Sequence, residues 1–310
     1  MIRRPPRSTL DRSSAASDVY KRQDLRPINK PRRRSPFSLS REILAFAVIT
    51  LAVFIAVTPG TLATHDPNVQ DIEHRLSAPG GNFLLGSDHF GRDVFSRIIH
   101  GFRASIAIGI LSVAIGTLVG LILGGSSSYI GGWLGMLVQG VTDVLLGFPI
   151  LLLAVVLIAA FGVSEATITI AVSTGFTPHI ARVSQILVAR IQTQQYVTAA
   201  ISLGLKNHQV LVRHILPACI GTVLAYSTSF VSTALVIESS LSFLGLGVPP
   251  PNPSWGNMLQ EGSKFLESAP WLVAFPATVL VMAALSFTVL GDFVRDTLDR
   301  SATTHRLDQQ

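Results

Sequence analysis

The sequence predicts an all-α, polytopic membrane protein with six transmembrane helices. Hydrophobic residues make up 48% of its 310 positions and charged residues only 14%, which is too apolar for an ordinary soluble domain. The apolar residues fall into blocks of about 20, the length that crosses a bilayer core. Arginine and lysine concentrate on alternate connections between these blocks, as they do in membrane proteins of fixed orientation.

Residues 1–23 are interpreted as a non-native, disordered segment. They carry six basic and two acidic side chains and so supply +4 of the net charge of +6. Residues 18–23, DVYKRQ, resemble the translated end of a sequencing adapter, and the alternative is a genuine disordered basic tail. The basic charge therefore gives no support for a nucleic-acid partner.

The chain then alternates between polar and apolar stretches. Residues 24–41 form a basic segment expected on the cytoplasmic side. Residues 42–101 hold the first span, over 43–58, and an external loop. Within that loop, residues 93–100 have helical periodicity and predict an amphipathic helix on the surface.

The second and third spans open the membrane core, residues 102–295. Residues 103–124 contain Gly116 and Gly120, a small-residue pair that allows close helix approach. A Ser/Gly turn over 126–132 leads to the third span, 134–161, where Pro149 predicts a kink. Asp143 lies early in this span, so we expect a structural ion pair or, as the minority interpretation, contact with cargo.

The last three spans are predicted over residues 166–188, 216–237 and 271–290, with Gly175 and Pro178 breaking the fourth. Glu238 follows the fifth span as a second acidic candidate for a pathway or structural role. A proline run over 249–253 predicts a helix-free loop. Trp255 and Trp271 are expected as anchors at the membrane interface. Residues 291–310 are expected to be polar and frayed, with residues 296–310 as the cytoplasmic tail.

Charge gives the same orientation as the crossing count. Six crossings return both termini to the cytoplasmic side. The segments assigned to that side hold Arg26, Lys30, Arg32, Arg33, Arg34, Arg41, Arg182, Arg190, Lys206, Arg213, Arg295, Arg300 and Arg306. The outer segments hold only Arg75, Arg92, Arg97, Arg103 and Lys264.

Residues 196–217 interrupt the apolar blocks between the fourth and fifth spans. Tyr196, Ala199, Ala200 and Leu203 share one helical face, and Gly204 predicts the end of that helix. Asn207 is expected to cap a second short helix, with Pro217 opening the next span. The pattern predicts a cytoplasmic helix-Gly-helix elbow.

The spacing of this elbow resembles the EAA motif of permease subunits in ABC importers. Thr198, Ala199, Ala200, Gly204, His214, Leu216 and Pro217 occupy its positions. Thr198 stands where the family has glutamate, and His214 where it has isoleucine, so a polar contact from that glutamate to an ATPase is lost. The resemblance implies that these residues form the loop that couples to the ATPase.

Two further stretches resemble the dipeptide, oligopeptide and nickel class of these permeases. The first is G-[ST]-D-x-x-G-R-D, carried by Gly86, Asp88, Gly91, Arg92 and Asp93. The second begins at Glu238 and ends in P-S-W-G, carried by Ser254, Trp255 and Gly256. Both are expected on the outer side.

The resemblance implies a multi-pass subunit of a bacterial or archaeal plasma membrane importer, and not an enzyme. Its implied partners are a homologous second permease, two ATP-binding subunits, an external solute-binding protein and the lipid membrane. No phosphate-binding loop occurs in the sequence, so ATP and Mg²⁺ are expected on the partner ATPases and no cofactor on this chain. Di- or oligopeptides are the implied cargo, with nickel as another possibility of the class.

Three alternatives remain at this point. An ion-driven secondary carrier would use Asp143 and Glu238 as relays, but no internal repeat supports it. A membrane-embedded enzyme lacks a catalytic constellation, and a scaffold leaves the elbow's spacing unexplained. Asp88, His89, Asp93 and His100 lack tight ligand spacing, so no metal site is expected.

Overall fold

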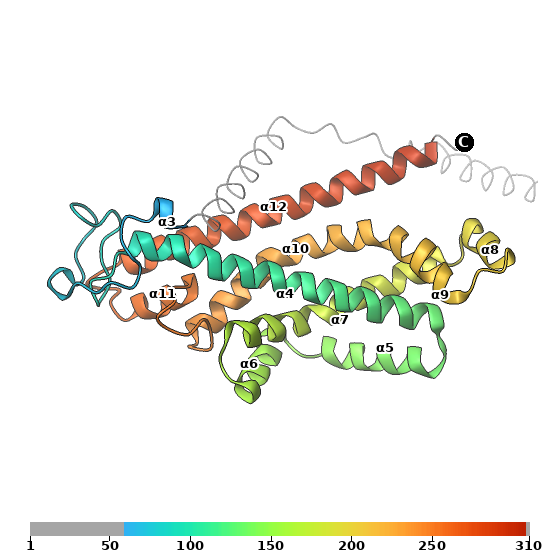
Figure 1. Cartoon of the computed structure of the whole chain (residues 1–310), viewed down its shortest axis with the longest axis horizontal. Helices are drawn as coiled ribbons and strands as arrows, with labels where there is room; N and C mark the ends of the chain where they lie inside the picture. Colours follow the sequence, from blue (N-terminus) through green and yellow to red (C-terminus); the bar gives the residue numbers. More distant parts are fainter. Residues whose placement is uncertain (1–58, 308–310) are drawn as a thin grey trace, which may run out of the picture. The chain divides into compact units, whose positions relative to one another are not determined.

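The computed structural model describes residues 59–307, all within one contact unit, residues 41–310. The adapter-like segment, the basic segment and the expected first span, residues 1–58, lie outside the described residues (Figure 1). Within residues 59–307 the regular structure is helical, and only two isolated β-bridges occur, in the segment before residue 94. The all-α prediction is confirmed for this part of the chain.

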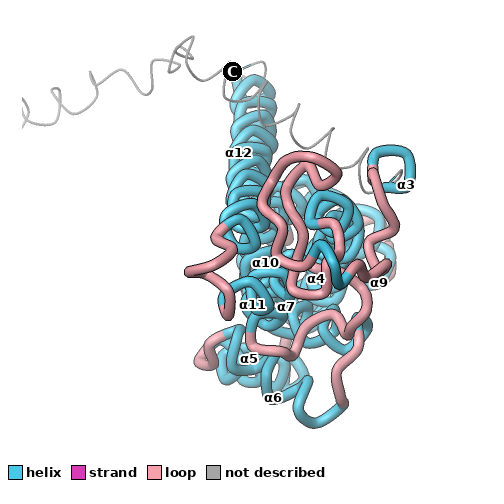
Figure 2. Tube along the Cα trace, turned by 90° about the vertical axis from the view of Figure 1, so that its left-hand side faces the viewer, coloured by secondary structure: helices cyan, strands magenta, loops and turns pink. Residues whose placement is uncertain are grey.

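Five long helices and several short ones make up the described chain. The long ones are α4 (Val94–Ile130), α5 (Gly132–Leu146), α7 (Glu165–Ile191), α10 (Leu216–Phe243) and α12 (Trp271–Leu307). The shorter ones are α3 (Pro59–Leu62), η1 (Ile72–His74), α6 (Ile150–Phe161), α8 (Gln195–Ser202), α9 (Asn207–Val210), the π-helical η2 (Leu211–Ile215) and α11 (Trp255–Ser263). Viewed end-on, α4, α7 and α10 lie between α12 on one side and α5 and α6 on the other (Figure 2).

Helices α4 and α7 pack in parallel through glycines on α4. A Cβ added to Gly116, Gly120 or Gly124 would lie 3.0, 2.8 or 2.2 Å from the carbonyl oxygens of Ser173, Thr177 and Ala181, respectively. Both sets of residues advance by four, so one face of α4 follows one face of α7 over about two turns. The predicted Gly116 and Gly120 pair is confirmed as a packing surface, and Gly124 extends it.

Helix α10 runs antiparallel to α4. Gly109 of α4 lies against Leu235, and Gly125 lies against Leu216, so the two sequences run in opposite directions along the contact. The core between these helices is apolar, with Val172, Phe176 and Ile180 of α7 fully buried. These directions agree with chain crossings that alternate as the sequence predicts.

Helix α4 begins earlier and ends later than the sequence predicted. Residues 93–100 do not form a separate surface helix, because Asp93 is the N-cap of α4 and its carboxylate accepts from the backbone N–H of Ser96 at 3.0 Å. The apolar residues of this segment face the protein, and Val94 and Ile98 are buried. The expected turn over 126–132 is also helical as far as Ile130, and the reversal occurs at Gly131 and Gly132, both with positive φ.

The predicted kink at Pro149 is a full break. Helix α5 ends at Leu146 and α6 begins at Ile150, with an angle of 99° between them. The residue before a proline is pushed out of the α region, which prevents α5 from continuing through Phe148. Gly175 of α7 makes room for the start of α6, since a Cβ there would lie 2.3 Å from Ile150 Cγ2.

Helix α7 is continuous, and the prediction that Gly175 and Pro178 break the fourth span is wrong. Pro178 is buried inside the helix, and α7 packs on α4, α5, α6 and α10. A proline removes only one backbone hydrogen bond, and neighbouring helices on several sides hold the backbone in place.

The end of the chain also continues as helix further than expected. Helix α12 begins at the predicted residue, Trp271, and runs to Leu307, so residues 291–307 are not a frayed tail. Gly291 does not end the helix, because it lies where α12 approaches α10: a Cβ there would be 3.0 Å from Ser229 Oγ.

Among the described residues, three helices are long and apolar enough to cross a membrane: Val94–Ile130, Asn207–Phe243 and Trp271–Thr297. The bent pair α5 and α6 adds a fourth if it counts as one span. Helix α7 is not in this set, since it carries many hydroxyl side chains. They are tolerated because the helix is surrounded by protein. The total of six crossings stays a prediction.

Candidate functional site

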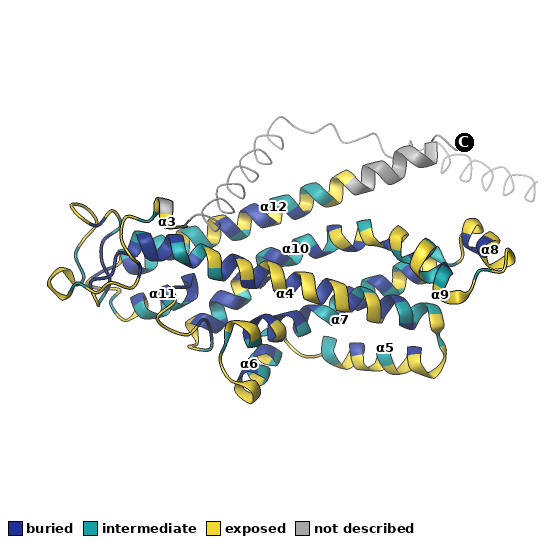
Figure 3. Cartoon of the chain, in the orientation of Figure 1, coloured by how far each residue is buried: buried dark blue, intermediate teal, exposed yellow. Residues whose placement is uncertain are grey.

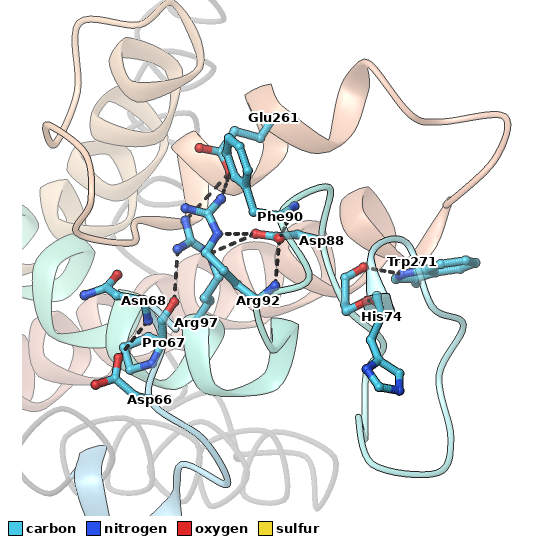
Figure 4. A network of polar contacts seen from close by, with 11 residues as sticks. Asp66, Pro67, Asn68, His74, Asp88, Phe90, Arg92, Arg97, Glu261 and Trp271 are labelled. Carbon is cyan, nitrogen blue, oxygen red and sulfur yellow. Dashed lines mark hydrogen bonds and ion pairs between the residues drawn. The ribbon is translucent and has the colours of Figure 1, made fainter. Parts of the chain in front are cut away.

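A network of four charged side chains joins the loop before α4 to α11 (Figure 4). Arg92 Nε lies 2.6 Å from Asp88 Oδ2, and Arg92 Nη2 lies 2.8 Å from Glu261 Oε2. Arg97 of α4 approaches the same two carboxylates at 3.7 Å. Both guanidinium groups are buried, so the two acids balance two charges taken out of water. The GRD signature therefore holds residues 86–97 against α11.

The second signature packs against the first. Trp255 is fully buried, its ring meets Phe102 edge to face, and its indole N–H points to the backbone oxygen of Ile98 at 3.4 Å. The expectation that Trp255 anchors the membrane interface is wrong, because the close approach of α11 to Gly101 seats it in the core. Trp271 is half-buried and donates to the backbone oxygen of Ser87 at 3.4 Å.

Asp88, His89 and Glu261 bring one potential metal-ligand atom each within 4.8 Å of one another. Both carboxylates are engaged by Arg92, and two guanidinium charges oppose a bound cation. His89 stacks on Phe265, and burial lowers the pKa of its imidazole. The arrangement fits an internal ion-pair cluster better than a metal centre.

The two acidic candidates of the core have protein partners. Glu238 is completely buried in α10 and accepts hydrogen bonds from Ser242 Oγ at 2.9 Å and Ser239 Oγ at 3.3 Å. Asp143 of α5 is half-exposed, and its Oδ1 lies 3.8 Å from Arg182 Nη1 on α7.

The elbow between α7 and α10 has the predicted helix-Gly-helix form. Helix α8 stops after Ser202, and Gly204 has φ +83°, a conformation that side-chain-bearing residues rarely adopt. Val197 and Ala200 are buried, whereas Tyr196, Ala199 and Leu203 are exposed. Thr198 is exposed too, and its hydroxyl reaches only the backbone oxygen of Gln194, at 3.4 Å.

The second half of the elbow differs from the prediction. Lys206, not Asn207, is the N-cap of α9, and Gln209 Oε1 accepts from its backbone N–H at 3.1 Å. Helix α9 does not end before Pro217 but runs through the π turn η2 into α10 as one helix, Asn207–Phe243. The wider π turn directly precedes Pro217, whose ring would otherwise clash with a carbonyl of the preceding turn.

The elbow and the signatures around Arg92 and Trp255 lie at opposite ends of this helix (Figure 1). Leu216, next to the elbow, contacts Gly125 near the end of α4, while Trp255 contacts Gly101 near its beginning. Helix α8, much of it coloured as exposed, lies at the end of the bundle (Figure 3).

A cavity of about 780 Å³ opens between the first half of α4 and the beginning of α7. Its lining includes the polar residues Asn68, Arg103, Glu165 and Asn252 and apolar residues such as Leu111 and Ile170. Arg97 helps to shape this lining, because its Nη1 donates to the backbone oxygen of Pro67 at 3.2 Å. Sequence reasoning missed this cavity, because residues from four separate segments build it.

Most of the helical bundle, including the elbow, matches a known protein family. Residues 116–304 match the family described as binding-protein-dependent transport system inner membrane component, a match that covers the elbow and the spans on both sides of it. The chain belongs to this family. It is thus a permease subunit of an ABC importer, a transport protein and not an enzyme, as the motif resemblance indicated.

Curated relatives of this permease cover most of its length. It is 34% identical over 257 residues to the dipeptide transport system permease protein DppC of Alkalihalophilus pseudofirmus, covering 83% of this chain and 84% of the relative. It is also 34% identical over 268 residues to the glutathione transport system permease protein GsiD of Escherichia coli, covering 86% and 87%.

Solved structures support the fold. The inward-facing MetNI methionine ABC transporter is similar with a TM-score of 0.53 and 18% identity, over 65% of this chain and 96% of that chain. At this identity the likeness concerns the fold alone, and it places the α4 to α12 arrangement among ABC transporter permeases.

Proposed function

We propose that this permease carries di- or oligopeptides across a bacterial or archaeal plasma membrane. In this proposal it works with a homologous second permease, two ATPase subunits and an external solute-binding protein. The elbow and both termini face the cytoplasm, and the signatures around Arg92 and Trp255 face outward. ATP and Mg²⁺ act on the partner ATPases. The single observation that carries the proposal is the elbow, at the end of the bundle opposite the outer signatures.

The exposed face of α8 supports a docking role for the elbow. Tyr196, Ala199 and Leu203 lie on one side of the helix, and Leu203 is 81% exposed. An apolar stripe on a segment expected in water is typical of an interface. Thr198, beside this stripe, has a hydroxyl where the EAA motif has the carboxylate of a glutamate. Apolar contacts therefore provide most of the binding to the ATPase.

The continuous helix Asn207–Phe243 supports a mechanical coupling. A displacement of α8 and α9 by the closing ATPases moves a rigid rod that reaches the outer signatures, because no break separates α9 from α10. At about 1.5 Å per residue this rod is about 55 Å long. Its motion against α4 and α7 would switch access to the pathway between the two sides, as a rigid-body transition.

Peptide cargo is supported by the names of the relatives, which are permeases for dipeptides and glutathione. An ion-driven carrier is less well supported. Glu238 is buried and accepts a hydrogen bond from Ser242, and Asp143 lies beside Arg182. Both acids therefore have partners within the chain, which does not favour a role as proton relays.

The test is ATP-driven peptide uptake by the reconstituted transporter, with substitutions on the exposed face of α8. We expect Leu203→Asp to abolish uptake and release the ATPase subunits, because it places a charge in the apolar interface. Leu84→Asp is the matched control, since Leu84 is also exposed, at 56%, but lies in the outer loop. Normal uptake with Leu203→Asp would refute the coupling role of the elbow.

A further inference from the structure

The outer cavity carries two opposite charges that the chain leaves unpaired. Arg103 lines it from α4 and Glu165 lines it from the first turn of α7. Both are exposed, and neither has an ion-pair or side-chain hydrogen-bond partner among the described residues. Arg103 lies within a helix long and apolar enough to span a membrane. A charge near the end of such a helix is stabilised when it faces water or a partner and not lipid, and the cavity gives Arg103 this position.

The neighbouring polar groups are also unused by the protein. Asn68 and Asn252 line the cavity from two separate loops, and neither side-chain amide makes a hydrogen bond within the described part of the chain. An amide offers both donors and an acceptor, the complement of a peptide bond. The cavity is also lined by apolar residues, among them Ala107, Ile108 and Leu111 of α4 and Ile170 of α7.

We propose that this cavity binds the substrate peptide by its free ends, with Arg103 pairing the terminal carboxylate and Glu165 the terminal ammonium. This inference rests on the proposed peptide transport and adds a site to it. The two amides bond the peptide backbone, and the apolar wall receives side chains without selecting among them. The charged ends of an extended peptide of two to four residues are roughly 6–14 Å apart. A volume of about 780 Å³ is that of a site for such a ligand.

A site that binds the charged ends would make recognition independent of the peptide's side-chain sequence. Every unmodified peptide carries one ammonium and one carboxylate, and bonds to charged groups are about twice as strong as neutral ones. A peptide with a blocked end would leave Arg103 or Glu165 unpaired, which disfavours its binding more than any loss of apolar contact.

The experiment measures occupancy of the cavity without the selectivity of the external binding protein. The full complex with its ATPases is reconstituted in phospholipid vesicles, and a photoreactive trialanine analogue is cross-linked and mapped. Competition is measured with trialanine, N-acetyl-trialanine and trialanine amide. In the wild type we expect cross-links on α4 and α7, and competition about tenfold weaker for each blocked peptide.

The variants give a specific pattern. Glu165→Gln should remove the discrimination against N-acetyl-trialanine only, and Arg103→Gln that against trialanine amide only, while Arg103→Lys retains it. Arg75→Gln and Glu73→Gln are matched controls, because both residues are exposed in the outer loop and do not line the cavity.

Three outcomes would overturn the inference: equal weakening of all three peptides by either variant, no difference between free and blocked peptides in the wild type, or a cavity filled by phospholipid that peptides do not displace. ATP-driven uptake of trialanine with the binding protein present is measured in the same vesicles. If uptake occurs but the cross-linking pattern fails, only the site is wrong. If uptake does not occur, the proposed peptide transport is wrong.

Discussion

The parallel contact between α4 and α7 can be tested through its glycines. A Cβ at Gly124 would lie 2.2 Å from the carbonyl oxygen of Ala181 and 2.7 Å from its Cα. Carbon and oxygen atoms in contact are normally about 3.3 Å apart, so Gly124→Ala requires the helices to separate by about 1 Å. Both atoms belong to the backbone and cannot rotate away.

The magnitude follows from two opposing effects. Overpacking costs about 1–3 kcal/mol, and this site belongs at the upper end because backbone meets side chain. Alanine in a helix interior returns about 1 kcal/mol relative to glycine. Gly124→Ala should therefore lower the free energy of unfolding by about 2 kcal/mol, or the melting temperature by about 4–8 °C.

The assay is thermal unfolding of the purified complex in detergent for Ala substitutions at Gly116, Gly120, Gly124 and Gly140. The loss should increase from Gly116 to Gly124, following distances of 3.0, 2.8 and 2.2 Å. Gly140 on α5 has nothing within 4 Å of an added Cβ, so Gly140→Ala should be neutral or stabilising. If Gly124→Ala and Gly140→Ala have the same melting temperature, the close approach of α4 and α7 is incorrect.

Three further predictions concern the charged groups. Glu261→Gln should destabilise the protein by about 1–3 kcal/mol, because it leaves Arg92 and Arg97 with only Asp88, whereas the exposed Glu267→Gln should change unfolding little; equal effects would argue against the cluster. Burial lowers the pKa of the His89 imidazole; the nearby Arg92 and Arg97 also lower it, whereas Asp88 and Glu261 oppose the shift. The folded state therefore loses stability as the pH falls through about 6.5, where the unfolded chain begins to bind the proton. Hydrogen exchange of residues 86–93 should rise, relative to intrinsic rates, at about pH 5.5 in the wild type but not in His89→Gln. Glu238→Gln should retain ATP-driven uptake, since the amide oxygen can still accept from Ser242; uptake that is lost, or that collapses with a proton ionophore, would favour an ion-driven carrier.

Local patterns in the sequence predicted the parts of the fold that depend on neighbouring residues. Gly204 ends α8, Trp271 begins α12 and the proline run lies in a loop, because each depends on the backbone preferences of a few residues. The elbow motif was recognisable for the same reason, as a fixed spacing within a single segment.

Features that depend on tertiary contacts were not predictable. Gly175 and Pro178 read as helix breakers, yet Gly175 accommodates Ile150 and packing keeps α7 continuous. Trp255 was predicted to be an interface anchor, because the residues around it give no sign that its ring packs against Gly101 of α4. Arg103 and Glu165 are 62 positions apart in the sequence, and only the α4–α7 contact brings them to one cavity.

The most direct test of the account is the side of the membrane on which the elbow lies. Thr198→Cys in the elbow and Asn252→Cys in the proline-rich loop are labelled with an impermeant thiol reagent in oriented vesicles, in a Cys219→Ser background, although Cys219 is itself buried. We predict that Thr198→Cys reacts only from the cytoplasmic side and is shielded by the ATPase subunits, and that Asn252→Cys reacts only from outside. Labelling of both positions from the same side would contradict the account.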